Sequence, residues 1–126
     1  MNNHNCEFLI VTCIDYRFQE YINKWTAENF APNTFDRVAI GGGVKNLETI
    51  LGQIDIACRL HHIPNVVLIN HEDCGAYGTE NFPDSQVEHQ KHAEDLKNAT
   101  AKINEKYPDL EVETYYLHLD GIFDKV

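Results

Sequence analysis

Two short segments carry residues whose types and spacing suit metal chemistry. The first reads Cys-x-Asp-x-Arg and contains Cys13, Asp15 and Arg17; the second reads His-x-x-Cys and contains His71 and Cys74. Deprotonated thiolate and neutral imidazole are good zinc ligands, and the His-x-x-Cys spacing lets one turn present two of them. Three protein ligands leave one tetrahedral position to water, which is typical of a catalytic site. The spacing therefore predicts a catalytic zinc site of Cys13, His71 and Cys74.

The residues beside these ligands suit the same chemistry. Bound Zn²⁺ lowers the pKa of water toward neutrality and makes a hydroxide nucleophile at ordinary pH. Two thiolates cancel the charge of the ion, so this centre should acidify water less strongly than three neutral histidines would. A nearby cation and a hydrogen-bond acceptor would then matter more, and Arg17 and Asp15 fit those roles. A structural ion pair between these two residues is compatible with this interpretation.

Both segments follow short apolar runs, at Glu7–Thr12 and Val66–Ile69. Near-continuous apolar runs are typical of strands buried on both faces of a parallel sheet. Ligands of open α/β sheets bind at the carboxyl ends of such strands. Parallel strands would therefore bring the two segments together at one edge.

The remaining periodicity predicts strands and helices in alternation. We expect further strands over residues 36–40 and 111–119, and helices over residues 18–29, from the glycine turn to about 62, and from 84 or 85 to about 106. In the last helix we expect the side chains of Val87, Leu96, Ala99 and Ile103 to face inward. The order predicts a single α/β domain spanning residues 1–126, with about four mostly parallel strands flanked by helices. We place the last strand at an edge of the sheet.

A glycine turn, Gly41 to Gly43, links the second strand to the helix after it. Backbone N–H groups of such a turn approach a ligand at the helix N-terminus, where the helix dipole favours an anion. Gly42 and Gly43 are therefore candidate substrate-binding residues. The spacing is not the dinucleotide fingerprint, and a glycine triplet alone is more often only a tight turn.

Charge and hydropathy exclude several classes of partner. The formal net charge of −10 argues against nucleic acid or an anionic membrane, although not against a small anionic substrate. No run approaches the roughly 20 apolar residues of a membrane-spanning helix, and the start lacks a signal-peptide pattern. We therefore expect a cytoplasmic protein whose four cysteines are free or metal-bound.

The two motifs, in this order and with the glycine turn between them, resemble those of the β-class carbonic anhydrases. The resemblance covers about residues 8–78. It implies a zinc-dependent lyase (carbonate dehydratase) that interconverts carbon dioxide and bicarbonate through zinc-bound hydroxide, with Cys13, His71 and Cys74 as ligands. It further implies that Asp15 and Arg17 orient the site, and that the chain forms a homodimer or higher homo-oligomer.

Two alternatives keep the same site. In some members of the family the aspartate is a fourth zinc ligand, so Asp15 could close the site of a non-catalytic zinc protein. An open site could instead hydrolyse carbonyl sulfide or carbon disulfide. The family's longer N-terminal arm has no counterpart before Glu7, and neither Gln19 nor Gln53 matches its pocket glutamine by motif. A cysteine phosphatase is excluded because three residues between Cys13 and Arg17 are too few for a phosphate loop.

We expect structural rather than metal-binding roles for the other cysteine, histidine and acidic side chains considered. We expect Cys6 and Cys58 to be inert, and His61 and His62 to suit the dipole at a helix C-terminus. His89 and His92 lie one turn apart on a polar helix and are interpreted as a solvated face. Glu72 and Asp73 are interpreted as exposed loop carboxylates, with a hydrogen bond to a ligand as the alternative.

Overall fold

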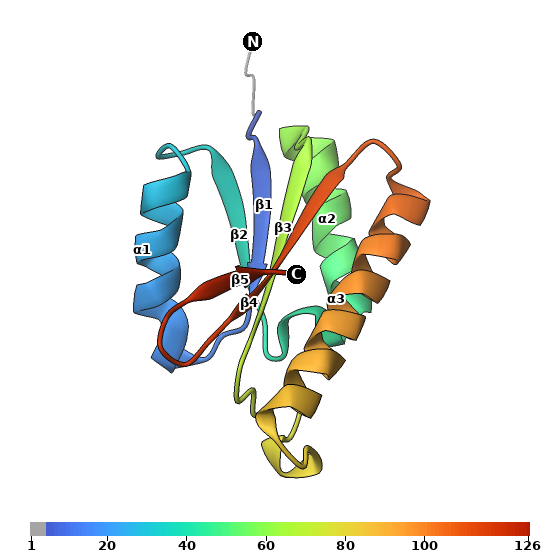
Figure 1. Ribbon diagram of the computed structural model, residues 1–126. Coiled ribbons are helices and arrows are strands. Elements are labelled where there is room, and N and C mark those ends of the chain that lie inside the picture. Colours follow the sequence, from blue (N-terminus) through green and yellow to red (C-terminus); the bar gives the residue numbers. More distant parts are fainter. Residues whose placement is uncertain (1–4) are drawn as a thin grey trace.

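Strands and helices alternate along the chain, and helices cover both faces of a central sheet (Figure 1). The computed structural model describes residues 5–126. Its elements are β1 (Phe8–Thr12), α1 (Gln19–Asn29), β2 (Phe35–Ala39), α2 (Leu47–His61), β3 (Asn65–His71), α3 (Ser85–Lys106), β4 (Glu111–Leu117) and β5 (Phe123–Lys125). The sheet order is β2-β1-β3-β4-β5, in which β5 alone is antiparallel to its neighbour. The predicted α/β fold with a mostly parallel sheet is confirmed.

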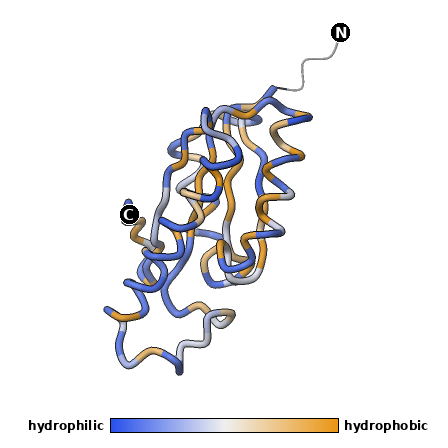
Figure 2. Tube along the Cα trace, turned by 90° about the vertical axis from the view of Figure 1, so that its right-hand side faces the viewer, coloured by the Kyte–Doolittle hydropathy of each residue, from blue (hydrophilic) through white to orange (hydrophobic). Residues whose placement is uncertain are grey.

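The central strands are buried on both faces, as their apolar runs predict. Successive side chains of β1 point to opposite faces, so Leu9 packs under α2 and α3 while Ile10 packs under α1. The strands form a continuous hydrophobic centre, whereas the helices alternate hydrophobic and hydrophilic stretches (Figure 2). Within residues 5–126, no helix combines the length and apolar character that crossing a bilayer requires.

The pairing of β1 with β3 places the two motifs side by side. The strands are parallel neighbours in a register that pairs Val11 with Leu68. Both carboxyl ends therefore lie at the lower end of the sheet in Figure 1. The loop after β1 carries the first motif, and the end of β3 with its following loop carries the second.

The expected edge position of β4 is wrong. After β4 the chain turns at Gly121, whose φ of +92° is in the left-handed region, and returns as β5. This strand pairs with Tyr115 to Leu117, and its Phe123 stacks on Trp25 of α1 with ring centroids 4.6 Å apart. Three residues are too few for periodicity to mark a strand, so the sequence did not predict β5.

The inward stripe of α3 begins with polar residues. Val87, expected to face inward, is 36% exposed, whereas Glu88 and His92 are 4% and 0% exposed. The apolar stripe of Leu96, Ala99 and Ile103 continues toward the N-terminus of α3 through these two positions. They are polar because this end of α3 covers polar groups of the motif loops.

Candidate metal centre

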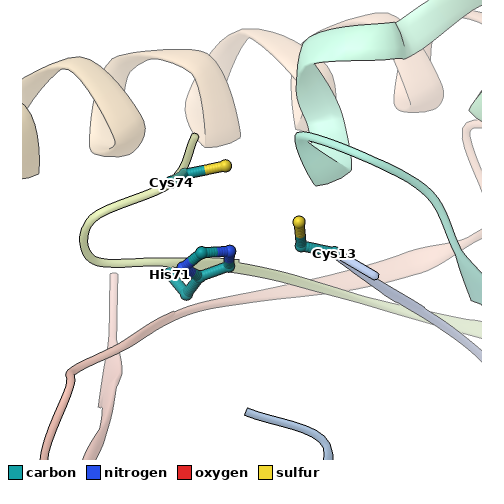
Figure 3. A group of neighbouring side chains, drawn as sticks. All are labelled: Cys13, His71 and Cys74. Carbon is teal, nitrogen blue, oxygen red and sulfur yellow. The ribbon is translucent and has the colours of Figure 1, made fainter. Parts of the chain in front are cut away.

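The three predicted ligands converge. Cys13 follows β1, His71 is the last residue of β3, and Cys74 lies in the loop beyond it. One ligand atom from each lies within 4.8 Å of the other two, and all three side chains are buried. Figure 3 shows the two sulfur atoms and the imidazole pointing toward one another. The arrangement has the donors and the spacing of a metal site.

Contacts around His71 leave one ring nitrogen directed at the thiols. Its Nδ1–H donates to the backbone carbonyl of Glu72 at 2.7 Å, which leaves the lone pair on Nε2. The Phe18 ring lies 4.2 Å from the imidazole, centroid to centroid. Nε2 is buried and has no hydrogen-bond partner among the described residues. A buried acceptor without a partner is costly, and a metal ion between Nε2 and the thiols would satisfy it.

The two thiols have unequal proton affinities. Interaction with the Cys74 thiol, helped by His71 and the N–H of Gly42, lowers the pKa of Cys13 despite its burial. Proximity to Cys13 and burial raise the pKa of Cys74. The Gly42 N–H donates to the Cys13 sulfur at 3.4 Å. One thiolate is thus stabilised by the protein, and a divalent cation would favour the second.

Asp15 is held in a two-pronged ion pair with Arg17. The guanidinium Nε lies 3.1 and 3.2 Å from the two carboxylate oxygens, and Nη2 donates to Oδ2 at 2.7 Å. The backbone N–H of Arg17 also donates to Oδ1 at 2.9 Å. Arg17 holds the pKa of the Asp15 carboxyl below its usual value. The Oδ2 atom lies 3.9 Å from His71 Nε2, so an ionised carboxylate borders the ligand group.

Arg17 also joins the first motif loop to the second. Its Nη1 donates to the Asp73 carboxylate and its Nη2 to the Asp73 carbonyl, both at 2.9 Å. Asp73 adopts a left-handed φ of +59°, and its N–H donates to buried Glu88 at 3.0 Å. Asp73 is therefore an ion-pair partner rather than a free loop carboxylate. Sequence reasoning missed Glu88; a carboxylate at an inward position of α3 was the available signal.

An open cleft of about 680 Å³ lies beside the ligand group and is lined by both loops. Its lining residues are Cys13, Ile14, Asp15, Tyr16, Arg17, Gly41, Asp73, Gly75, Ala76 and Thr79. Gly42 and Gly43 are buried behind Cys13 and are not among them. Their role in binding substrate stays a prediction.

A polar network behind the site holds the glycine turn in place. Asn70 faces away from His71, because neighbouring strand residues alternate. Its Oδ1 accepts from the Val44 N–H at 3.2 Å, and its Nδ2 donates to Tyr77 at 3.1 Å and lies 2.9 Å from His92 Nδ1. The solvated-face interpretation of His92 is therefore wrong. A polar residue within an apolar strand was the signal for Asn70.

Gln19 binds the backbone of the first motif loop. Its side-chain N–H groups donate to the carbonyls of Cys13 at 3.2 Å and Asp15 at 2.8 Å, while its oxygen accepts from Arg37 at 2.8 Å. Sequence reasoning gave this residue no role, because no motif contains it. Gln53 is exposed on α2.

Comparison with known sequences shows a family relationship along almost the whole chain. Residues 3–126 match the model of a family described as "Putative carbonic anhydrase". An uncharacterised protein of Rickettsia conorii is 30% identical over 131 residues, covering 94% of this chain and 70% of the relative. An uncharacterised protein of Rickettsia bellii is 29% identical over 131 residues, covering 94% of this chain and 80% of the relative.

Solved structures share the fold. The carbonic anhydrase of Streptococcus mutans superposes with a TM-score of 0.61 at 16% identity, covering 100% of this chain and 86% of that one. The carbonic anhydrase of Glaciozyma antarctica superposes with a TM-score of 0.59 at 17% identity, covering 94% of this chain and 80% of that one. One of two tetrameric β-carbonic anhydrases of Sordaria macrospora superposes with a TM-score of 0.59 at 15% identity, covering 98% of this chain and 81% of that one.

Proposed function

This chain belongs to the carbonic anhydrase family whose model it matches, and on that premise we propose that it is a zinc-dependent lyase interconverting carbon dioxide and bicarbonate. The observation that carries the proposal is the convergence of two thiols on the unpartnered, buried Nε2 of His71. Cys13, His71 and Cys74 are the proposed zinc ligands. Residues 1–126 are proposed to act as one zinc-binding domain.

The donor set fits zinc, and the surrounding residues fit the reaction. Zinc bound here would activate water as a nucleophile near neutral pH. Asp15, which Arg17 keeps ionised and fixed, would accept a hydrogen bond from that water and so help to orient it toward carbon dioxide. Ile14 and Ala76 provide apolar cleft surface for carbon dioxide. The Arg17 guanidinium, beside the same cleft, would attract the bicarbonate anion.

A closed, non-catalytic zinc site is the second candidate. Asp15 Oδ2 lies only 3.9 Å from His71 Nε2, so a modest side-chain movement would make it a fourth ligand. Against this, all of the Arg17 hydrogen bonds to the carboxylate would have to rearrange. The open site is therefore the favoured candidate. Carbonyl sulfide and carbon disulfide would enter the same cleft and stay alternative substrates.

Carbon dioxide hydration by stopped-flow, with zinc counted on the same sample, tests the proposal. We expect wild type to be active and Cys74→Ser to lose both activity and about one zinc ion per chain. Cys58→Ser is the matched control, because Cys58 is a free thiol on α2 away from the motif loops.

Two results would argue against the lyase. If Cys74→Ser kept the zinc content and the activity of wild type, the proposed zinc centre would be contradicted. Zinc lost by Cys74→Ser, together with no wild-type activity at pH 7 or pH 9, would favour the closed site or another substrate. Far-UV circular dichroism of each variant checks that the fold is kept.

A further inference from the structure

A second group of metal-type side chains lies at the other end of the sheet. Cys6 precedes β1, Asp36 is in β2 and His61 ends α2. One ligand atom from each lies within 4.8 Å of the other two, and all three residues are half-buried. The starts of β1 and β2 and the end of α2 gather at the upper end of the molecule in Figure 1, opposite the motif loops.

Backbone and side-chain contacts hold this group together. The Cys6 N–H donates to the His61 carbonyl at 2.9 Å, which docks the segment before β1 against the end of α2. His61 Nδ1 lies 2.5 Å from Asp36 Oδ2. Asp36 is itself fixed within the sheet by the pairing of β2 with β1, where it lies opposite Leu9. Three elements far apart in sequence therefore present a thiol, an imidazole and a carboxylate to one point.

The same three residue types could form a nucleophilic triad, but the surroundings of Cys6 oppose that use. Burial and the Asp36 carboxylate both raise the pKa of the Cys6 thiol. A nucleophilic cysteine requires the opposite shift, since the thiolate is the reactive form. A divalent cation between the sulfur and the carboxylate would instead make both anions favourable.

We propose that Cys6, Asp36 and His61 bind a divalent transition-metal ion, with zinc best matched to the donors. Thiolate, imidazole and carboxylate are all zinc ligands, whereas Mg²⁺ and Ca²⁺ prefer oxygen donors alone. One thiolate and one carboxylate balance the charge of the ion. With bonds of about 2.0–2.2 Å to nitrogen and oxygen, the ion would open the short His61–Asp36 contact by roughly 1 Å. Partial exposure leaves a fourth position to water.

This site is separate from the centre at Cys13. Cys13 lies seven positions after Cys6 along largely extended chain, which at about 3.3 Å per position is roughly 20 Å. One ion cannot serve both groups. An ion at Cys6 would cross-link the starts of β1 and β2 to the end of α2, so its role is to stabilise the fold.

Zinc counting on the full chain tests this site independently of catalysis. Protein is saturated with zinc, freed of loosely bound ion by buffer exchange, and measured by mass spectrometry. We expect Cys6→Ser to retain about one zinc per chain fewer than wild type, with carbon dioxide hydration unchanged. Cys58→Ser, which removes the other half-buried thiol, should match wild type. Equal zinc content in wild type and Cys6→Ser would overturn the proposal.

Asp36→Asn supplies a second measurement in a variant that keeps the side-chain shape. Titration with a competing chelator should show one zinc ion bound at least about tenfold more weakly than in wild type, because an anionic ligand has become a neutral amide. Zinc binding at the Cys13 centre, at the other end of the sheet, should be unaffected. An unchanged zinc titration would contradict a ligand role for Asp36 and with it the proposed site.

Discussion

His92 illustrates how a single side chain takes its protonation state from its surroundings. It is fully buried, accepts a hydrogen bond at Nδ1 from the Asn70 amide, and packs against the Tyr77 ring at 4.0 Å between centroids. Its pKa is lowered to about 4, first by burial and then by electrostatic interaction with His71 and His89, while Asp95 and Cys13 oppose the shift. Glu88 also faces it, with 3.9 Å between His92 Nε2 and the carboxylate. His92 is therefore neutral in the folded protein at pH 7.

This protonation state predicts a pH-dependent stability. The unfolded chain takes up a proton at His92 near its ordinary pKa of 6.5, and the folded chain only near 4. The unfolded state thus binds more protons than the folded state between these two pH values. The contribution of neutral His92 to the free energy of unfolding is therefore complete above pH 6.5 and is lost as pH falls toward 4. A shift of this size corresponds to up to about 3 kcal/mol.

Urea denaturation of wild type and His92→Gln at pH 7.5, 6 and 4.5 checks this expectation. The amide of glutamine offers Asn70 a partner but does not titrate. The loss of unfolding free energy on acidification should be smaller in the variant. If the free energy of unfolding fell equally with pH in the two proteins, His92 would not be buried in its neutral state.

At the scale of elements, the glycine turn between β2 and α2 connects the sheet to the metal centre. Gly43 has a left-handed φ of +56°, and a Cβ there would lie 2.5 Å from Asn70 Oδ1. The turn thereby lets Asn70 accept from Val44 while Gly42 donates to Cys13. The site therefore depends on the left-handed conformation of this turn rather than on its flexibility.

Alanine at two glycines of this region should have opposite effects. Gly43→Ala should destabilise the fold by about 1–3 kcal/mol, because it forces a side chain into a left-handed position and against Asn70. Gly52→Ala, within α2 and with nothing within 4 Å of the added Cβ, should stabilise by up to about 1 kcal/mol. Urea unfolding of both variants measures the difference. Gly43→Ala as stable as Gly52→Ala would show that the turn tolerates a side chain.

At the scale of the whole molecule, apolar surface gathers beside the cleft. Ile14 and Tyr16, both lining it, are 62% and 84% exposed. Side chains of this kind in contiguous patches often mark protein–protein contacts. The homo-oligomer that the sequence motifs lead us to expect stays a prediction, and this patch is a candidate contact for it.

Light scattering coupled to size-exclusion chromatography measures this state directly. We expect a mass of at least twice the 14.5 kDa of one chain at micromolar concentration. Tyr16→Asp should reduce that mass if the patch forms the contact, because a charge there would be desolvated on association. A wild-type mass of 14.5 kDa throughout the micromolar range would contradict the oligomer.

The sequence by itself determined the fold class and the convergence of the main site. Ligand-type residues directly after apolar β-type runs imply one shared edge, because parallel strands carry their carboxyl ends to the same side. This local rule was enough to bring Cys13, His71 and Cys74 together. Helical periodicity likewise marked α1, α2 and α3, with differences of a few residues at their ends.

The tertiary structure alone decided the features that depend on distant contacts. The pairing of Arg17 with Asp73 and the burial of His92 arise where separate elements pack, and no local spacing encodes such packing. The same holds for β5, a short strand that the sheet edge and Trp25 stabilise. It holds as well for Cys6, Asp36 and His61, which meet only because β1, β2 and α2 share one end of the sheet.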